Sequence, residues 1–344
     1  MKKDIFTIDS HTDGEPTRVI VGGIVNVPGR DIQEKREYVK EHYDYVRKAL
    51  MCEPRGHRDM FGCFLVEPTV PEADFGIIFI DNYHYLNMCG HGTIGIATTV
   101  VESNLVDVSQ KKDKTVVFES PAGIIKVNVD IDKAGKVKSA SLTNVPAFTE
   151  YKDLEVNLPG YGLTKLDVVF GGNYFAILPV EQFGTSIEPE NTTKLKELGA
   201  LVKEAVNKKV EIVHPEKPYI KGVDIVTFFT ENTAPGIKYR NVHIFSTKQA
   251  DRSPGGTGTS AMLAYYHARG ELRVSDEIYS QGLLGKGTFK GKILSETTVG
   301  NFKGIIPEIM LMYGKEASNR KQEIDRQHYT IPNQRPKDKH CGKI

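Results

Sequence analysis

The sequence contains the same short pattern twice: a glycine-rich turn followed directly by an apolar stretch of helical length. The first copy is MCGHGTIG at residues 88–95, whose apolar run continues to residue 101. The second copy is DRSPGGTGT at residues 251–259, followed by the helix-compatible stretch 261–270. Aligned on their glycines, Cys89 faces Gly255, 166 residues further along the chain. A repeat at this spacing indicates an internal duplication, so we expect two similar halves, each built around one apolar helix.

Segments with strand character surround both apolar stretches. They are rich in β-branched and aromatic residues and end at Gly or Pro; they lie at 5–9, 18–21, 62–66, 75–80, 115–119, 123–129, 139–142, 166–170, 174–178, 223–229 and 242–245. The charge-rich segment 31–51 and the segment 191–207 suit surface helices. A helix that is apolar all round must be buried. The sequence therefore predicts a mixed α/β (α+β) protein whose sheets curl around a buried helix in each half.

Length and composition agree with two domains and a small-molecule partner. The chain has 344 residues, of which 39% are hydrophobic, so each half can bury a core of its own. Lys and Arg number 45 against 44 Asp and Glu, which leaves no basic field for nucleic acid or a membrane. We expect domains at residues 1–145 and 146–307. The polar, charged segment 308–344 is expected to be a poorly ordered tail.

The first residues and the cysteines indicate the cellular compartment in which we expect the protein. The first residues turn polar before an apolar core of signal-peptide length can form, and no run approaches a membrane span. The four cysteines, at positions 52, 63, 89 and 341, have no paired spacing, as expected of reduced thiols in a cytoplasm. We therefore expect a cytoplasmic protein.

Cys89 is the residue with the clearest chemistry. At a helix N-terminus the backbone N–H groups and the helix dipole together lower a thiol's pKa and create a seat for an anion. Cys89 is thus a candidate base beside a carboxylate site. The N–H groups of Gly90 and His91 in the first turn, and of Gly256 and Thr257 in the second, are candidates for holding that carboxylate, because glycines let the backbone approach closely.

Cofactor and metal sites are not indicated. Cys89 and His91, separated by one residue and without a second ligand cluster, make a weak metal site. We interpret His91 as a wall or polarising residue. Neither turn has the GxxxxGK[ST] order of a phosphate loop. No lysine stands in either turn to hold pyridoxal phosphate.

The pairing of MCGHGTIG with DRSPxGTGT resembles the signature of the proline racemase family. Further motifs occur in the order of that family: SHTDGEPTR at 10–18, EPRGHRDMFG at 53–62, PAG at 121–123, NVPAF at 144–148 and FGGN at 170–173. The resemblance reaches from the N-terminus to about Pro307. It implies two pseudo-symmetric, antiparallel barrels of the diaminopimelate-epimerase type with the active site in the cleft between them. It also implies a cofactor-independent enzyme for a small imino acid, and a homodimer.

The resemblance further implies roles for three residues. The ring nitrogen of the substrate would meet Asp251, and its ring would pack against Phe61 and Phe245. Racemisation by two bases needs a second group on the opposite face of the substrate, and racemases and epimerases of this family have a second cysteine at the position of Gly255. Glycine has no side chain to serve as that group.

A glycine at position 255 leaves three functional alternatives open. Water could act as a poor second acid and leave slow or one-sided exchange. Cys89 could instead drive a one-base elimination of a 3-hydroxyl, the reaction of the trans-3-hydroxy-L-proline dehydratases of this family, which have threonine at the second position. The protein could also bind an imino acid without turning it over. We predict α-proton abstraction from proline or hydroxyproline by Cys89, with two-base racemisation impaired.

Overall fold

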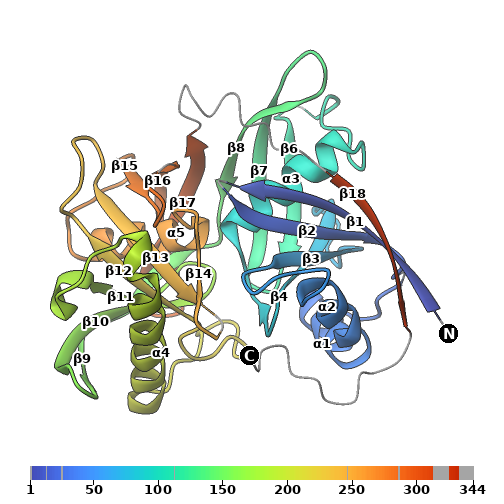
Figure 1. Cartoon of the computed structure of the whole chain (residues 1–344). Helices are drawn as coiled ribbons and strands as arrows, with labels where there is room; N and C mark the ends of the chain where they lie inside the picture. Colours follow the sequence, from blue (N-terminus) through green and yellow to red (C-terminus); the bar gives the residue numbers. More distant parts are fainter. Residues whose placement is uncertain are drawn as a thin grey trace. The chain divides into compact units, whose positions relative to one another are not determined.

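The computed structural model describes residues 2–12, 14–24, 26–111, 113–245, 247–285, 287–312 and 325–332 (Figure 1). By contacts within the chain it divides into two compact units. Unit 1 comprises residues 1–140 with 320–344, and unit 2 comprises residues 141–319.

Unit 1 contains a surface-helix pair, a buried helix and a sheet. Its helices are α1 (Ile32–His42), α2 (Asp44–Met51) and α3 (Gly90–Glu102). Its strands are β1 (Lys2–Thr12), β2 (Glu15–Gly22), β3 (Phe61–Val66), β4 (Phe75–Asp81), β5 (Tyr85–Leu86), β6 (Thr115–Ser120), β7 (Gly123–Ile131) and β18 (Asp325–Pro332). Strand β8 (Val137–Thr143) leads into unit 2. The single helix expected over 31–51 is wrong in one respect, since Tyr43 leaves the helical conformation (φ −123°, ψ 9°) and separates α1 from α2.

Unit 2 has one long surface helix and one buried helix. The helices are α4 (Thr192–Lys209) and α5 (Gly256–Ala268), preceded by short 3₁₀ turns at Val180–Phe183 and Pro189–Asn191. The strands are β9 (Ala147–Leu158), β10 (Gly162–Phe170), β11 (Tyr174–Pro179), β12 (Ile225–Thr230), β13 (Tyr239–Phe245), β14 (Gln249–Ala250), β15 (Glu277–Gln281), β16 (Thr288–Val299) and β17 (Phe302–Met312).

The two units repeat one pattern of strand pairing. In unit 1, β1 and β2 are antiparallel, β2 and β3 parallel, β3 and β4 antiparallel, and β4 is parallel to β6. In unit 2, β10 and β11 are antiparallel, β11 and β12 parallel, β12 and β13 antiparallel, and β13 is parallel to β15. Short β5 and β14 occupy matching places before α3 and α5. The duplication predicted from the two glycine turns is therefore a duplication of topology.

Each sheet curls around its apolar helix. In unit 2 the pairings run from β9 through β10, β11, β12, β13, β15, β16 and β17 and back to β9, which closes a barrel. Helix α5 contacts β9, β10, β11, β16 and β17 from inside this ring. In unit 1, α3 contacts β1, β2, β3 and β7, and its residues from Gly90 to Val101 are all buried. The expected fold class, a curled sheet around a central helix in each half, is confirmed. The sheets are mixed rather than antiparallel throughout, because β2 and β3, β4 and β6, β11 and β12, and β13 and β15 pair in parallel.

The strand that pairs with the first strand of the repeated pattern comes from a different part of the chain in each unit. In unit 2, β9 precedes β10 directly and pairs with it. In unit 1 the matching partner of β1 is β18, which pairs antiparallel from Lys2↔Pro332 to Asp9↔Asp325. Strand β18 and the end of β17 lie in the segment 308–344, where we expected poor order. Residues 313–324 and 333–344 lie outside the described residues.

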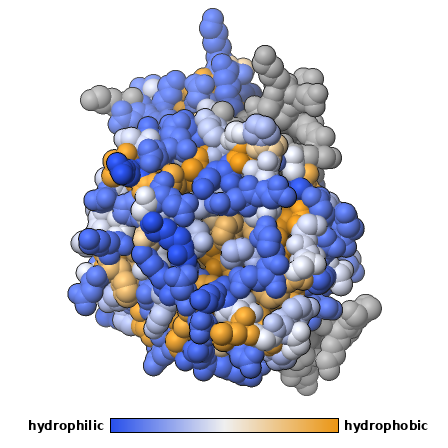
Figure 2. Space-filling model, turned by 90° about the vertical axis from the view of Figure 1, so that its left-hand side faces the viewer, coloured by the Kyte–Doolittle hydropathy of each residue, from blue (hydrophilic) through white to orange (hydrophobic). Residues whose placement is uncertain are grey.

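The surface is mostly polar. On the face shown in Figure 2, hydrophilic residues cover most of the area and hydrophobic residues form small groups between them. Of the large hydrophobic side chains in the described residues, Leu163 on β10 is the most exposed, at 66%. Among the described helices, none is long and apolar enough to cross a membrane.

Candidate functional site

Cys89 caps the N-terminus of α3. Its backbone is extended (φ −145°, ψ 119°), and its Sγ accepts a hydrogen bond from the Gly92 N–H at 3.4 Å. The Cys89 carbonyl accepts from both the N–H (3.0 Å) and the hydroxyl (2.6 Å) of Thr93. The thiol thus takes the place that Ser, Thr, Asp or Asn usually has at a helix start. The sulfur lies where the helix dipole favours negative charge.

An imidazole and an aromatic ring surround this sulfur. Nδ1 of His91 lies 3.2 Å from Sγ, and the His91 ring meets the Phe61 ring edge-on at 4.8 Å between centroids. Gly92 makes this possible, because a Cβ there would lie 2.9 Å from Cε1 of Phe61 and 3.3 Å from the Cys89 sulfur. Cys89, Gly90, His91 and Phe61 therefore form one buried group.

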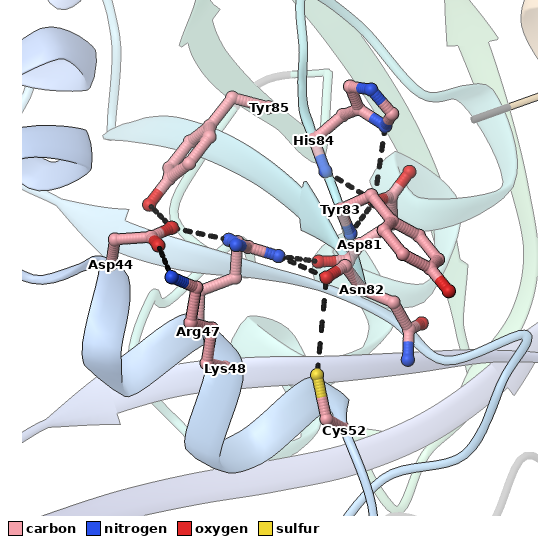
Figure 3. A network of polar contacts seen from close by, with 9 residues as sticks. All are labelled: Asp44, Arg47, Lys48, Cys52, Asp81, Asn82, Tyr83, His84 and Tyr85. Carbon is pink, nitrogen blue, oxygen red and sulfur yellow. Dashed lines mark hydrogen bonds and ion pairs between the residues drawn. The ribbon is translucent and has the colours of Figure 1, made fainter. Parts of the chain in front are cut away.

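A polar network fixes the segment that leads into Cys89 (Figure 3). Arg47 of α2 pairs with Asp44 at 2.6 Å and donates to the carbonyls of Asp81 and Asn82 at the end of β4. The Tyr85 hydroxyl donates to Asp44 at 3.0 Å. Burial raises the pKa of Asp81, while two backbone N–H bonds to its carboxyl oppose that rise. The turn between β4 and β5 is thus tied to α2.

Three further hydrogen bonds hold the same segment. Arg36 of α1 donates to Oδ1 of Asn87 at 2.6 Å, two residues before Cys89. The Asn82 amide donates to the carbonyls of Met51 (2.7 Å) and His57 (2.8 Å). The buried arginines of α1 and α2 therefore serve to place the glycine turn, which explains why these charge-rich helices carry buried cations.

The second glycine turn, in unit 2, is braced by Asp251. Its Oδ1 accepts from the N–H (2.8 Å) and the hydroxyl (2.7 Å) of Ser253, whose Oγ in turn accepts from the Gly255 N–H at 3.1 Å. Gly255 is the N-cap of α5, with φ +76° and ψ 113°, and no side-chain cap bond is present there. The Gly255 carbonyl accepts from the Thr259 hydroxyl at 2.7 Å. Gly256 and Thr257 follow in the first turn of α5.

The predicted residues thus fall into two groups, one in each unit. Asp251, Gly255, Gly256 and Thr257 share the second turn, and Phe245, 6% exposed, ends the neighbouring strand β13. Sequence reasoning missed His243, also on β13, whose imidazole lies against Gly255 and Gly258. A histidine within a strand pattern does not by itself indicate a functional residue. The contact of His243 with the turn depends on strand register, which the sequence does not show.

Three of the four cysteines, Cys52, Cys63 and Cys89, lie in the described residues. Cys63 and Cys89 form no disulfide bond, and burial raises the pKa of Cys63 far above its ordinary value. The Cys52 sulfur lies 4.0 Å from the carbonyl oxygen of Asn82. Cys341 lies outside the described residues. Within the described part of the chain, no group of three or more His, Cys, Asp or Glu side chains could hold a metal ion.

Comparisons with known proteins place the chain in a family. The family model described as proline racemase matches residues 7–315. The proline racemase of Clostridioides difficile is 49% identical over 307 residues, covering 89% of this chain and 91% of that protein. The 4-hydroxyproline 2-epimerase of Cereibacter sphaeroides is 42% identical, covering 94% and 97%. The crystal structure of a hydroxyproline epimerase from Agrobacterium vitis, with bound trans-4-OH-L-proline, superposes with a TM-score of 0.86 at 28% identity, covering 96% and 93%.

Proposed function

This chain belongs to the proline racemase family, and from that premise we propose that it removes the α-proton of proline or a hydroxyproline with the Cys89 thiolate, without a cofactor. The relatives named above are racemases and epimerases, and the chain is an enzyme of that class. The observation that supports the proposal is the position of the Cys89 thiol at the start of α3, where it accepts a hydrogen bond from the Gly92 N–H and lies beside His91.

The reaction needs three things from the protein. The α-hydrogen of an imino acid is a poor acid, so its removal requires a placed base, a partner for the carboxylate and donors for the charge that develops on it. Cys89 is the base in this proposal. The first-turn N–H groups at Gly90 and His91, and at Gly256 and Thr257, would meet the carboxylate, because helix N-termini favour anions. Asp251 would meet the ring nitrogen, and Phe61 and Phe245 would pack on the ring.

We propose that two-base racemisation is impaired. A racemase must return the proton from the face opposite to the one that lost it, and Gly255 has no group to do so. Its φ of +76° also disfavours any residue with a side chain. The expected reaction with L-proline is therefore one-sided exchange of the α-hydrogen, with little net formation of the D-enantiomer.

The same glycine favours one second candidate, a dehydratase acting on trans-3-hydroxy-L-proline. In that reaction Cys89 takes the α-proton, the bond from carbon 3 to its hydroxyl breaks, and the hydroxyl leaves with a proton as water. The cyclic enamine that remains isomerises to an imine. This elimination asks for only one strong base, which a site with Cys89 and Gly255 can supply.

Exchange in deuterated water tests the proposal. Solvent deuterium should enter the α-position of one enantiomer, and Cys89→Ala should reduce the rate at least 10³-fold, on the order expected for loss of a general base with its positioning. Cys63→Ala is the matched control, because Cys63 is a buried thiol of the same unit to which the proposal gives no role in the reaction. Exchange that survives Cys89→Ala would refute the assignment.

Product analysis separates the candidates. L-proline, D-proline, trans-4-hydroxy-L-proline and trans-3-hydroxy-L-proline are incubated side by side, and release of a cyclic imine from the last identifies the dehydratase. Binding of pyrrole-2-carboxylate, a planar mimic of the deprotonated substrate, without any exchange would identify an imino-acid-binding protein instead. On the family resemblance we also propose a homodimer, to be tested by light scattering. On the unpaired spacing of the four cysteines we propose a cytoplasmic location, to be tested by cell fractionation.

A further inference from the structure

The space beside Gly255 is already filled. A Cβ atom on Gly255 would lie well under 3.0 Å from Cδ2 and Nε2 of His243, closer than real Cβ atoms come to a neighbour. A Cβ on Gly258, one turn further into α5, would meet Cε1 and Nε2 of the same ring. The imidazole therefore lies against the first turn of α5, and both glycines are needed to admit it.

The corresponding place in unit 1 has the opposite arrangement. Cys89 and Gly92 hold the positions in α3 that Gly255 and Gly258 hold in α5, as the N-cap and the third residue of each helix. Cys89 has an extended backbone with φ −145°, which any residue can adopt, and its own sulfur accepts from the Gly92 N–H. In unit 2 the backbone is in the glycine-favouring region, and a ring from β13 takes the place of a capping side chain.

The hydrogen bonds of His243 show that the ring is locked. Nε2 lies 2.9 Å from the Pro254 carbonyl, and Nδ1 lies 2.8 Å from the Thr227 hydroxyl. A carbonyl can only accept, so Nε2 carries the proton and Nδ1 accepts from Thr227. The ring is 3% exposed, and burial lowers its pKa to about 4. The imidazole is therefore neutral at neutral pH, and both nitrogens are already bonded.

From these contacts, and resting on the proposed function above, we infer that His243 is a specificity-determining residue that fills the space of the second catalytic side chain and confines the site to one base. The ring does not replace the missing base, because its one lone pair is directed at the Thr227 hydroxyl and its one N–H at Pro254. Neither solvent water nor a side chain at position 255 can take up the vacated volume while the ring remains.

The inference predicts energetic coupling between positions 255 and 243, which a double-mutant cycle in chemical denaturation measures without substrate. Gly255→Ala should raise the unfolding equilibrium constant of the otherwise unchanged protein roughly tenfold to hundredfold more than Gly236→Ala does. Gly236 is the matched control, because its φ of +84° imposes the same backbone strain while a Cβ there would meet nothing within 4 Å. In a His243→Ala background the excess penalty of Gly255→Ala should disappear.

Additive penalties in the two backgrounds would overturn the inference. If Gly255→Ala does not fold with His243 in place, recovery of a folded protein on adding His243→Ala supports the inference, and failure to recover it counts against it. Because this cycle uses no substrate, its outcome is independent of whether Cys89 performs the proposed reaction.

Catalysis gives a second readout. Gly255→Cys alone should not raise the rate of proline racemisation, because the ring blocks the new side chain. Gly255→Cys combined with His243→Ala should raise that rate at least tenfold over the single variant. Equal racemisation by Gly255→Cys with and without His243 would show that the ring is no obstacle.

Discussion

At the scale of single residues, the two glycine turns differ at one matching position, and the proposed reaction depends on that difference. Cys89 and Gly255 cap helices in matching places of two units with the same topology. Only the first presents a group that can accept a proton. The second is built around His243, a side chain that is buried, neutral and bonded at both nitrogens.

The low pKa of His243 leads to a prediction on stability. The folded protein binds this proton only near pH 4, whereas the unfolded chain binds it near the ordinary value of 6.5. Between these values the unfolded state holds more protons, so the free energy of unfolding should fall as the pH falls. The contribution of His243 to the free energy of unfolding is complete above pH 6.5 and should decrease by about 2 kcal/mol between pH 6.5 and 5. Urea titrations over this range measure it.

His214 must be separated from this effect. Burial also lowers its pKa to about 4, so it contributes with the same sign. A His243→Asn variant keeps His214, and its stability should depend on pH less steeply than that of the parent by the amount stated. Parallel curves for the two proteins would contradict the prediction.

At the residue scale, the sequence can indicate candidate site residues where a local motif surrounds them. Cys89, Gly255 and Asp251 could be singled out because each lies in a glycine-rich turn that is recognisable from the sequence itself. His243 could not, since its role arises from the register that brings it opposite Thr227 and next to a turn twelve residues further on. Long-range register of this kind has no mark in the sequence of either partner.

At the scale of elements, the sequence predicted both buried helices because their residues are apolar on every side. It did not predict how α5 is fixed. Asn144, just before β9, donates its amide to the Gly171 carbonyl (2.9 Å) and to the Ser260 hydroxyl (2.8 Å), and its Oδ1 accepts from the Val145 N–H. Gly171 itself must be glycine, because a Cβ would lie 2.6 Å from the carbonyl oxygen of Thr257 in α5.

These hydrogen bonds of Asn144 lead to a prediction at the scale of elements. Asn144→Asp keeps the acceptor for Val145 but places a carboxylate oxygen against the Gly171 carbonyl, both of which can only accept. Asn144 is 3% exposed, so we expect a loss of about 2 to 3 kcal/mol in the free energy of unfolding from the unpaired buried groups. Ser260→Ala is the control, since it removes only one partner and should cost about 1 kcal/mol. Equal losses in the two variants would show that Asn144 does not hold α5 in this way.

At the scale of the whole molecule, duplication left the two units unequal in how their sheets are completed. Unit 2 receives β9 from the residues directly before β10, so its barrel closes with local chain. Unit 1 receives β18 only after the chain has passed through the whole of unit 2. The polar composition of residues 308–344 pointed away from such a strand, because β18 is an outer strand whose apolar contacts are few and spaced.

One of those contacts allows a whole-chain prediction. Ile331 is 1% exposed and packs in a core cluster with Ile5, Ile20 and Met60. Truncation after Met312 removes this side chain and the partner strand of β1, so unit 1 should lose about 1.5 to 3 kcal/mol from the apolar burial alone. Hydrogen exchange should show the loss at β1, whose amides lose their bonds to β18, while β10, paired with β9, keeps its protection. Full-length Ile331→Ala is the control: it keeps the strand pairing and should destabilise unit 1 without freeing the β1 amides. If β1 stays as protected in the truncated chain as in the parent, unit 1 does not depend on the returning strand.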